Sequence, residues 1–273
     1  MAFWKPNEPL QLGSTFHDIN VSTGRIVRRP GSAKRLSSVF DLNPFLRELP
    51  KDLRNNLRET MRTSRAYGRG TELRGVGVGG TVHIVLSGCV RECTTPPAST
   101  VRILGAGAVL GCTEVFDERI PAPLTTCLTE TWTLCLPLER LRAMAEANSV
   151  LLKAIGVSVT DRMEASERIY NRLAYKSEQR LAGLLAHLLM HCAVPGKRYD
   201  FMIEGPSQHD LAAALSLSIG SVEGAMASLR KSNIVITGYR TYEFPSVRRL
   251  LEASQIKFPP GSLAGTLTSF QAP

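Results

Sequence analysis

Residues 207–231 constrain the fold of this chain more narrowly than any other segment. Two short amphipathic helix patterns flank the turn-forming residues 216–218. Ser207 is a good N-cap residue, and Leu211 and Leu215 form one apolar stripe on the first helix. Small residues at positions 212 and 213 allow close helix crossing, and the second helix has its own apolar stripe: Val222, Met226 and Leu229. The pattern predicts two short helices that cross steeply.

The residues that follow predict a small β-hairpin and a final helix. Strands are expected at 233–236 and 241–244, with a turn at 237–240. Ser246 is placed to cap a helix that carries Val247, Leu250 and Leu251. Two crossed helices followed by such a wing are the arrangement that places the second helix in the major groove of DNA. A plain helical hairpin with no nucleic acid partner is the alternative.

Upstream, residues 71–137 contain short β-type runs separated by turn formers. Strands are expected at 81–86, 89–91, 101–104, 108–110 and 131–136, with Ser87-Gly88 and Pro96-Pro97 in turns. This spacing predicts a compact antiparallel barrel or jelly roll rather than a parallel sheet with crossovers. A helix at 50–65 is expected before it, because Leu53, Leu57 and Met61 recur every four residues.

Helical periodicity then continues through three segments, 138–148, 149–172 and 177–190. The middle segment has residues at steps of three or four that approach a heptad seam: Leu152, Ile155, Val159, Met163, Ser166, Ile169 and Leu173. The seam predicts pairing with the same helix of a second copy, and therefore a homodimer. A helix packed on its own barrel would show a similar pattern, so this alternative stays open.

The expected fold class is α+β, with five regions along the chain. They are a basic N-terminal tail (1–40), an antiparallel β-barrel sensor domain (41–148), a dimerisation helix (149–172), a winged helix-turn-helix (173–252) and a C-terminal tail (253–273). The tails are assigned because both mix Gly, Ser and Pro without periodicity.

The charge of the chain fits a polyanionic partner but does not identify one. The formal net charge is +9, and residues 1–75 alone hold 14 Lys and Arg against 7 Asp and Glu. Two interpretations of this basic leader remain, contact with phosphates or a solvated tail, and it receives no specific role. Its basic residues include Arg25, Arg28, Arg29, Lys34 and Arg35.

Several classes of protein are not expected. No segment approaches the roughly 18 to 20 apolar residues that span a bilayer, and the first residues do not resemble a secretory signal. We therefore expect a cytoplasmic protein with no membrane partner. Its six cysteines should be reduced thiols, because their irregular spacing suggests no disulfide framework: Cys89, Cys93, Cys112, Cys127, Cys135 and Cys192. No nucleophile–base arrangement or phosphate-binding glycine loop is present, so no enzyme is expected.

Two cysteine and histidine groupings have a metal-binding alternative. His187 and His191 lie one helical turn apart and precede Cys192, but they lack a further ligand in sequence. Cys89 and Cys93 have the spacing of an iron–sulfur ligand pair, but residues 1–88 contain no cysteine to complete a set. We expect no metal and no other cofactor.

The order of these elements resembles the Crp/Fnr family of transcription regulators over residues 41–252. The sequence VHIVLSGCV at 82–90 resembles the family's strand that ends in a glycine turn, and GAVLGCTEVF at 107–116 resembles its glycine-rich barrel motif. Residues 207–229 resemble its helix-turn-helix. The resemblance implies a barrel of the cyclic-nucleotide-binding type, a long dimer helix and a winged helix. It also implies as partners double-stranded DNA and a second copy of the chain, with RNA polymerase as a further candidate.

The barrel departs from the family pattern for cyclic AMP. Relatives that bind it place a Glu where this chain has Cys112, and an Arg-Ser pair where it has Ala122-Pro123. The missing guanidinium is the strongest charge-assisted partner for a phosphate, so we expect no cyclic AMP binding by this chemistry. A pocket for another effector would involve four residues: Cys112, Glu114, Ser166 and Glu167.

The predicted reading helix departs as well, because no arginine stands where the family often has one to contact guanine. The candidates for base contact are Ser218, Gly220, Ser221 and Glu223, the last able to accept from a cytosine amino group. The candidates for phosphate contact are Ser207, Gln208, Arg230, Lys231 and Arg240. For each of them a solvated surface residue is the alternative. The rival function is that of a degenerate family member whose barrel and glycine-containing helix contact protein instead of DNA.

Overall fold

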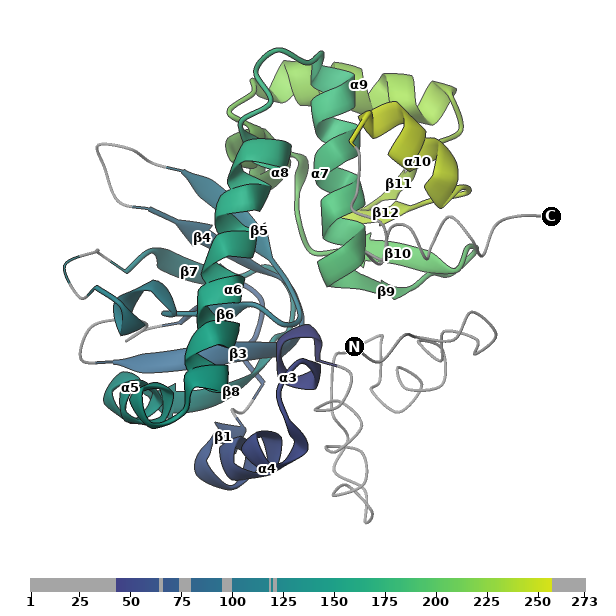
Figure 1. Ribbon diagram of the computed structural model, residues 1–273. Coiled ribbons are helices and arrows are strands. Elements are labelled where there is room, and N and C mark those ends of the chain that lie inside the picture. The colour runs from purple at the N-terminus through teal and green to yellow at the C-terminus, as the bar shows by residue number, and fades with distance from the viewer. Residues whose placement is uncertain are drawn as a thin grey trace.

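The computed structural model of the chain describes residues 43–63, 66–73, 80–94, 100–117, 119 and 122–256. The predicted tail 1–40, the Pro96-Pro97 turn and most of the predicted tail 253–273 lie outside these residues. Two bodies are joined by a long helix: a β-barrel with short helices at one end, and a winged helix (Figure 1).

The barrel consists of two four-stranded antiparallel sheets, as the sequence predicts. In the first, the strand order is β1 (Arg62–Thr63), β8 (Trp132–Pro137), β3 (Thr81–Ser87) and β6 (Val109–Leu110). In the second it is β2 (Glu72–Leu73), β7 (Leu124–Cys127), β4 (Val90–Cys93) and β5 (Val101–Leu104). The strands β1, β2 and β7 were not predicted, because two are only two residues long and β7 follows a proline pair without strong alternation.

Alternation along β3 decides which side chains enter the barrel. Val82, Ile84 and Leu86 pack toward α3 (Pro44–Arg47), α4 (Lys51–Thr60) and α5 (Leu138–Ala147). Val85 belongs instead to an interior cluster with Val90 and Leu110. A 3-10 turn, η1 (Thr113–Val115), follows β6. The predicted helix 50–65 ends early, at α4, because the chain extends from Met61 into β1.

The long helix α6 (Ser149–Ala165) lies along the barrel (Figure 1). The Asn148 side chain caps it by accepting from the amides of residues 150 and 151. A π-helical turn, η2 (Ser166–Tyr170), ends it, so the single helix predicted at 149–172 is divided. The predicted seam is wrong at Ile155, which is buried against the barrel, and at Ile169, which is buried with the winged helix. The apolar residues at helical spacing in this segment therefore belong to two different cores, one in the barrel and one in the winged helix.

The winged helix is built around α7 (Ser177–Cys192), which is buried on most of its sides. The helices α8 (Gln208–Leu215), α9 (Ile219–Lys231) and α10 (Val247–Ser254) surround it. A four-stranded sheet completes the domain in the order β11 (Ile236–Gly238), β12 (Thr241–Glu243), β10 (Phe201–Glu204) and β9 (Ala193–Pro195). The hairpin β11–β12 is the predicted wing, but its first strand covers Ile236–Gly238 and not the predicted residues 233–236. The strands β9 and β10 were not predicted.

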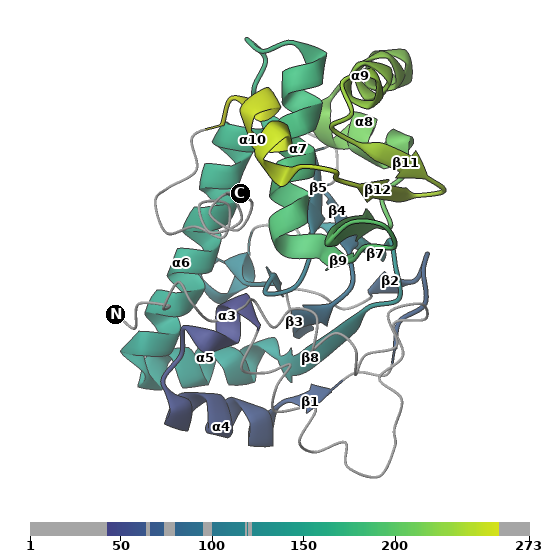
Figure 2. The same ribbon diagram turned by 90° about the vertical axis from the view of Figure 1, so that its right-hand side faces the viewer.

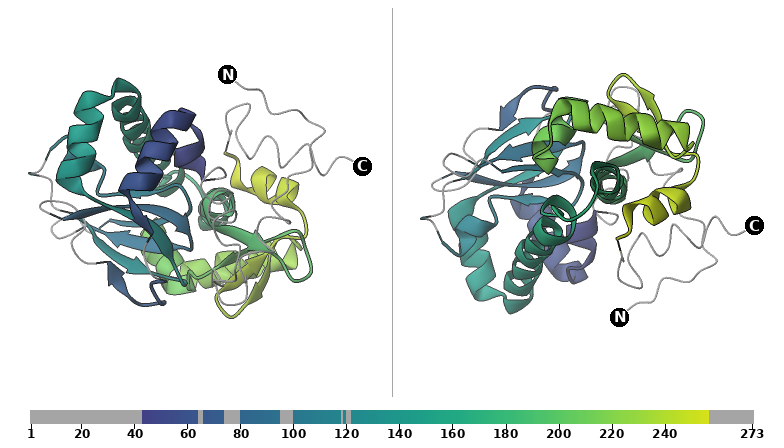
Figure 3. Two further views of the ribbon diagram at one scale, coloured as in Figure 1. Left: turned by 90° about the horizontal axis from the view of Figure 1, so that it is seen from below. Right: turned by 90° about the horizontal axis from the view of Figure 1, so that it is seen from above.

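The winged helix and the barrel share one hydrophobic core. Barrel residues Cys89, Ile103 and Leu128 cluster with residues of the winged helix such as Ile203 and Leu211. Figure 2 shows α7 and α8 beside β4 and β5, and the views from below and above in Figure 3 show the winged helix, coloured green to yellow, lying beside the barrel. A continuous core thus crosses the boundary between the barrel and the winged helix. The domain limits given from the sequence stay a prediction.

Among the residues with described positions, no single helix is long and apolar enough to cross a membrane, and α8 with α9 reaches that length only as a bent pair.

Candidate nucleic-acid interface and barrel interior

The turn between α8 and α9 is set by local side-chain chemistry. Ser207 and Asp210 form a reciprocal capping box at the start of α8, in which each side chain accepts from the other's backbone amide. Ser216 ends α8 in the left-handed region at φ 51°, and the Ser218 side chain caps α9. The two helices are bent by 110° relative to each other, within the range of helix-turn-helix motifs.

The outer side of α9 faces solvent. Val222, Met226 and Leu229 are buried on the inner side, as predicted from the sequence. The exposed side carries Gly220, Glu223, Gly224, Ala227, Arg230 and Lys231. A Cβ added at Gly220 or Gly224 would meet nothing within 4 Å. The surface that α9 presents to a duplex therefore consists mostly of small side chains and has few charges.

The predicted base-contact residues do lie together at the start of α9. The Ser218 and Ser221 hydroxyls are 2.8 Å apart and hydrogen-bonded, and Glu223 lies half a turn further along on the exposed side. Sequence reasoning missed Gly224 and Ala227 as members of this face. The helical period from Gly220 would have identified both, since positions three and four apart share a side.

The predicted phosphate-contact residues separate into two groups. Arg230 and Lys231 are exposed at the end of α9. In contrast, the Arg240 guanidinium turns back onto its own domain, where it donates to the Gly205 carbonyl at 2.6 Å and to Asp210 Oδ2 at 3.1 Å. Ser207 also hydrogen-bonds Asp210, and Gln208, the first residue of α8, is half-buried.

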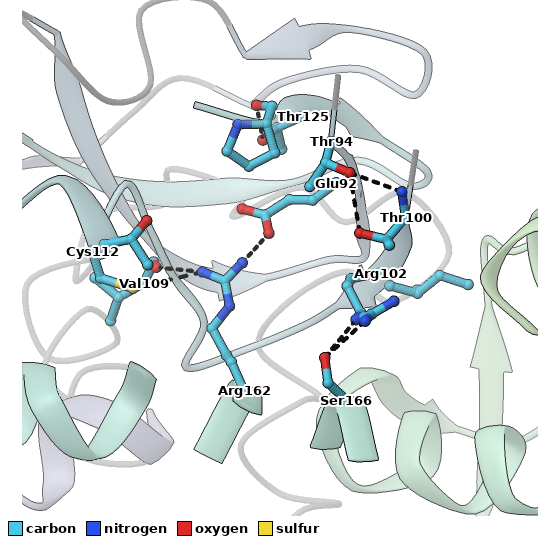
Figure 4. Close-up of polar contacts among 12 residues, drawn as sticks. Glu92, Thr94, Thr100, Arg102, Val109, Cys112, Thr125, Arg162 and Ser166 are labelled. Atoms are coloured by element: carbon cyan, nitrogen blue, oxygen red, sulfur yellow. Dashed lines mark hydrogen bonds and ion pairs between the residues drawn. The ribbon is translucent and has the colours of Figure 1, made fainter. Parts of the chain in front are cut away.

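Inside the barrel, α6 contributes a guanidinium. Arg162 reaches inward from α6 and forms an ion pair with Glu92 of β4, shown in Figure 4. Its Nη1 atom also lies 3.4 Å from the Val109 carbonyl oxygen and 3.6 Å from Cys112 Sγ. The long helix is thereby tied to the barrel interior by one charged side chain. Sequence reasoning missed this pair, although Arg162 follows the apolar stripe of Leu151 and Ile155 at helical spacing.

The surroundings of Arg162 are acidic and largely buried. Glu92 is only 2% exposed, and burial raises the pKa of its carboxyl group against the opposing effect of Arg162. Glu114 is fully buried and accepts a hydrogen bond from the Thr113 hydroxyl at 2.8 Å. Within the described part of the chain, one carboxylate oxygen of each glutamate has no hydrogen-bond partner. Burial also raises the pKa of the Cys112 thiol, which keeps it neutral.

A second arginine connects β5 to the end of α6. The Nε and Nη2 atoms of Arg102 donate to the Ser166 hydroxyl at 3.1 and 2.8 Å, and its guanidinium lies 4.4 Å from the Tyr170 ring centroid. The four predicted effector residues are therefore not one cluster. Cys112 and Glu114 surround Arg162, Ser166 binds Arg102, and Glu167 is exposed.

A cavity of about 700 Å³ lies beside α6, between α3, the β5–β6 connection and α7. Its lining includes Phe45, Arg102, Val157, His187 and His191. The two histidine rings are 4.8 Å apart, and burial lowers both pKa values, that of His191 to about 4. Among the residues described here, no three potential ligands come together to hold a metal ion.

No protein-family model matches the sequence, and no curated protein matches it. Solved structures do resemble the fold. FixK2 from Bradyrhizobium japonicum is 17% identical, with a TM-score of 0.58 over 72% of this chain and 99% of its own. A CRP-family transcriptional regulator from Thermus thermophilus is 16% identical, with a TM-score of 0.56 over 70% of this chain and 96% of its own.

A third resemblance is to the c-di-GMP-responsive global regulator CLP of Xanthomonas campestris. It is 20% identical, with a TM-score of 0.52 over 70% of this chain and 97% of its own. Each of the three is covered almost completely, so the likeness includes both the barrel and the winged helix. The chain therefore has the fold of the Crp/Fnr regulators: an antiparallel barrel, a long helix and a C-terminal winged helix-turn-helix.

Proposed function

We propose that the protein is a DNA-binding transcription regulator of the Crp/Fnr type that acts as a homodimer on a near-palindromic site. The observation that carries the proposal is the exposed outer side of α9 behind a 110° turn. That arrangement presents a helix to the major groove while its inner side holds the domain together. The solved regulators with the same fold support it.

The exposed apolar residues of α6 form the proposed dimer surface. They are Val150, Leu152, Val157 and Met163, and all but Leu152 also border the cavity beside the helix; Met163 is 66% exposed. Gly156 lies on the same helix with open space around it, so a second helix can approach its backbone closely. Pairing across this surface would relate two winged helices by a two-fold axis, as a palindromic site requires.

The dimer surface is tested by sedimentation of Val157→Glu against Asn55→Glu, a substitution with the same charge change at an exposed position of α4. Val157→Glu should shift the protein to monomers, because it places a charge in an apolar seam. If both variants sediment like the wild type, α6 is not the interface.

We also propose that the barrel does not bind cyclic AMP. Ala122 and Pro123 supply no guanidinium for a cyclic phosphate, and the arginine inside the barrel is already paired with a buried carboxylate. A phosphate bound there would have to displace Glu92 from Arg162, which would leave a buried charge without its partner. Micromolar binding of cyclic AMP in titration calorimetry would contradict this.

The DNA-binding proposal is tested by genome-wide immunoprecipitation followed by fluorescence anisotropy on the enriched sequence. An enriched palindrome is expected, bound with strong salt dependence. Gly224→Glu should abolish binding, because it adds bulk and negative charge to the face turned toward DNA. Asn55→Glu, on the exposed side of α4, changes the net charge equally and should not. The same precipitates show whether RNA polymerase, the further partner we propose, is retained.

Absence of any enriched palindrome, together with a stable protein partner, would support the rival function of a protein-interaction module and overturn the one proposed here.

A further inference from the structure

The cavity beside α6 lies mainly outside the barrel. Its volume of about 700 Å³ falls within the range of roughly 300 to 1,000 Å³ that holds small-molecule ligands in proteins. On α6 it is bordered by Val150, Ala154 and Val157, which follow one another at steps of three and four. Leu151 and Ile155, which pack onto the barrel, are not in its lining. The cavity therefore lies along a different side of the helix, and residues of α3 and α7 complete its wall.

Most of this wall is apolar. Phe45 of α3, Leu104 of β5 and Met163 of α6 border the cavity, together with the backbone of the β5–β6 connection. Apolar surface of this kind gains free energy when the apolar body of a ligand displaces water from it.

A row of side chains provides the polar part of the wall. The Arg102 guanidinium lies 4.4 Å from the Tyr170 ring centroid. The Tyr170 ring is 6.1 Å from the His187 ring, which is 4.8 Å from the His191 ring. Burial lowers the pKa of both histidines, so both rings are neutral. Within the part of the chain that the structure describes, neither imidazole has a hydrogen-bond partner.

Arg102 is the charge that decides the class of ligand. It is half-buried, and burial lowers the pKa of its guanidinium. Its described polar partners are uncharged: the Ser166 hydroxyl, shown in Figure 4, and the Val101 carbonyl. Among the described residues, no carboxylate forms an ion pair with it.

The other charged residues at the cavity leave this guanidinium uncompensated. Glu48 and Arg162 border the cavity, but each already has an ion-pair partner. Lys153 and Asp161 are exposed and opposite in sign, so solvent screens both. A half-buried cation without a counter-ion in a mostly apolar cavity favours a ligand that is itself mostly apolar and carries one negative charge.

We propose that the cavity binds an apolar monocarboxylate, a fatty acid or an aromatic acid, whose carboxylate pairs with Arg102 and whose apolar body fills the space between α3, α6 and α7. A guanidinium matches the planar geometry of a carboxylate and can donate two parallel hydrogen bonds to it. The two neutral imidazoles are available to a further polar atom of the ligand. The inference goes beyond the proposed function, because it concerns a small molecule and is tested without DNA.

Titration calorimetry of the full-length protein tests the proposal with octanoate and naphthoate as probes. At least one of the two acids should saturate at one molecule per chain, and the tighter of the two shows whether the site takes a chain or a ring. Octanol and octylamine have the same chain as octanoate without its negative charge. Both should bind at least about tenfold more weakly than the acid, because they cannot pair with a guanidinium.

The position of the ligand is tested by Arg102→Gln, which should weaken acid binding roughly 10- to 100-fold and leave octanol binding unchanged. Arg102→Lys retains the charge and should have a smaller effect. The matched control is Arg119→Gln, at an exposed barrel arginine paired locally with Asp117, and it should bind the acids like the wild type. Equal affinities in Arg102→Gln and the control would overturn the proposal.

A second variant keeps the test decisive if Arg102→Gln does not fold. Ala154→Phe adds bulk to the cavity from α6 and changes no charge. It should abolish the binding of both acids, whereas unchanged binding would place them elsewhere and overturn the proposal.

A second copy of the chain is the alternative occupant, because Val150, Val157 and Met163 belong to both the cavity wall and the proposed dimer surface. Leu152→Glu disrupts that surface without bordering the cavity. Acid binding to the wild type and to Leu152→Glu alike supports the proposal. Binding to Leu152→Glu alone would show that the second copy fills the cavity, and binding to neither would show that the cavity takes no carboxylate. Either result would overturn the proposal.

Discussion

Glycine has two opposite roles in this chain, and the difference lies in what surrounds each position. At Gly105 and Gly205 a side chain would collide with a neighbouring backbone or side chain. At Gly220 and Gly224 a side chain would meet open space, and both residues are inside a helix. A helical glycine without a packing reason costs stability, so the packing of the described residues does not explain these two glycines.

Gly224→Ala should therefore stabilise the protein by about 0.8–1 kcal/mol, because alanine reduces the backbone entropy lost on folding the helix. Urea unfolding measures this. Gly183→Ala on α7 is the control that should destabilise it, since its Cβ would lie 2.8 Å from Ile256 Cδ1 and 2.9 Å from Arg172 Nη1. Loss of stability in Gly224→Ala would mean that the outer side of α9 packs against protein. That result would contradict the exposure of α9 on which the proposed function rests.

His83 predicts a pH dependence of stability. Its ring is buried in the barrel, with Nδ1 3.0 Å from the Thr133 hydroxyl and 3.3 Å from Cys135 Sγ. Burial lowers its pKa from 6.5 to about 4. Because the unfolded chain then binds the proton more tightly, His83 contributes stability that is complete above pH 6.5 and declines as the pH falls toward 4. The loss is at most about 3 kcal/mol.

Thermal unfolding between pH 7 and 4 checks this prediction. His83→Gln should reduce the dependence by the share of one histidine, since the buried His187 and His191 also have lowered pKa values, whereas the exposed His209→Gln should leave it as in the wild type. Equal slopes in all three proteins would show that His83 is not the titrating group.

At the scale of elements, α6 is a helix with two functions on two faces. Its inner face packs Leu151 and Ile155 onto the barrel and sends Arg162 into the interior. Its outer face carries exposed apolar residues and Gly156. Strand β4 has the same double character, because Arg91 faces the winged helix while Glu92 faces Arg162. Adjacent residues on one strand thus connect the long helix to the helix-turn-helix.

Arg162→Met should lower the free energy of unfolding by roughly 3 kcal/mol, because it leaves the buried Glu92 carboxylate without its partner. The double variant Glu92→Val with Arg162→Met should regain most of that loss, since it removes both charges. Urea unfolding of the single and double variants measures the coupling. If the double variant is no more stable than Arg162→Met, the pair does not act as a unit.

At the scale of the whole molecule, the barrel and the winged helix share one core, so we expect them to unfold as one cooperative unit. Residues of β4, β5 and the β7–β8 turn share a core with α7, α8 and β10. The ion pair between Arg91 and Asp210 and the hydrogen bond from the Ala106 amide to the His191 carbonyl also join the two bodies. Movement of the winged helix therefore has to break polar contacts and expose apolar surface together.

Gly105→Ala should separate the two bodies, because its Cβ would overlap the His191 carbonyl. We expect a loss of roughly 1–3 kcal/mol and a second transition in calorimetry, as the barrel and the winged helix begin to unfold independently. Gly220→Ala, where there is space, should retain a single transition. A single transition at the wild-type temperature in Gly105→Ala would refute the tight approach.

Local chemistry was enough to predict most elements of this protein. The capping box at Ser207, the turn at Ser216 and the alternating strands are recognisable because each depends on residues close in sequence. The barrel, the helix-turn-helix and the exposed side of α9 could thus be predicted before any coordinates were known. The exposure of Arg230 and Lys231 at the end of α9 follows from the same helical period, whereas their predicted contact with phosphates stays a prediction.

The tertiary structure alone decided which apolar residues of α6 face inward, that Arg162 meets Glu92, and that Arg240 pairs with Asp210 instead of standing free. The two ion pairs join residues 70 and 30 positions apart in sequence, and helical or strand periodicity does not predict contacts over such separations. The sequence pattern around a residue predicts whether its side chain is buried. The partner that the side chain contacts depends on how separate elements pack. The position of the winged helix against the barrel is therefore set by the packing of separate elements and by the close approach of the two bodies at Gly105 and Gly205.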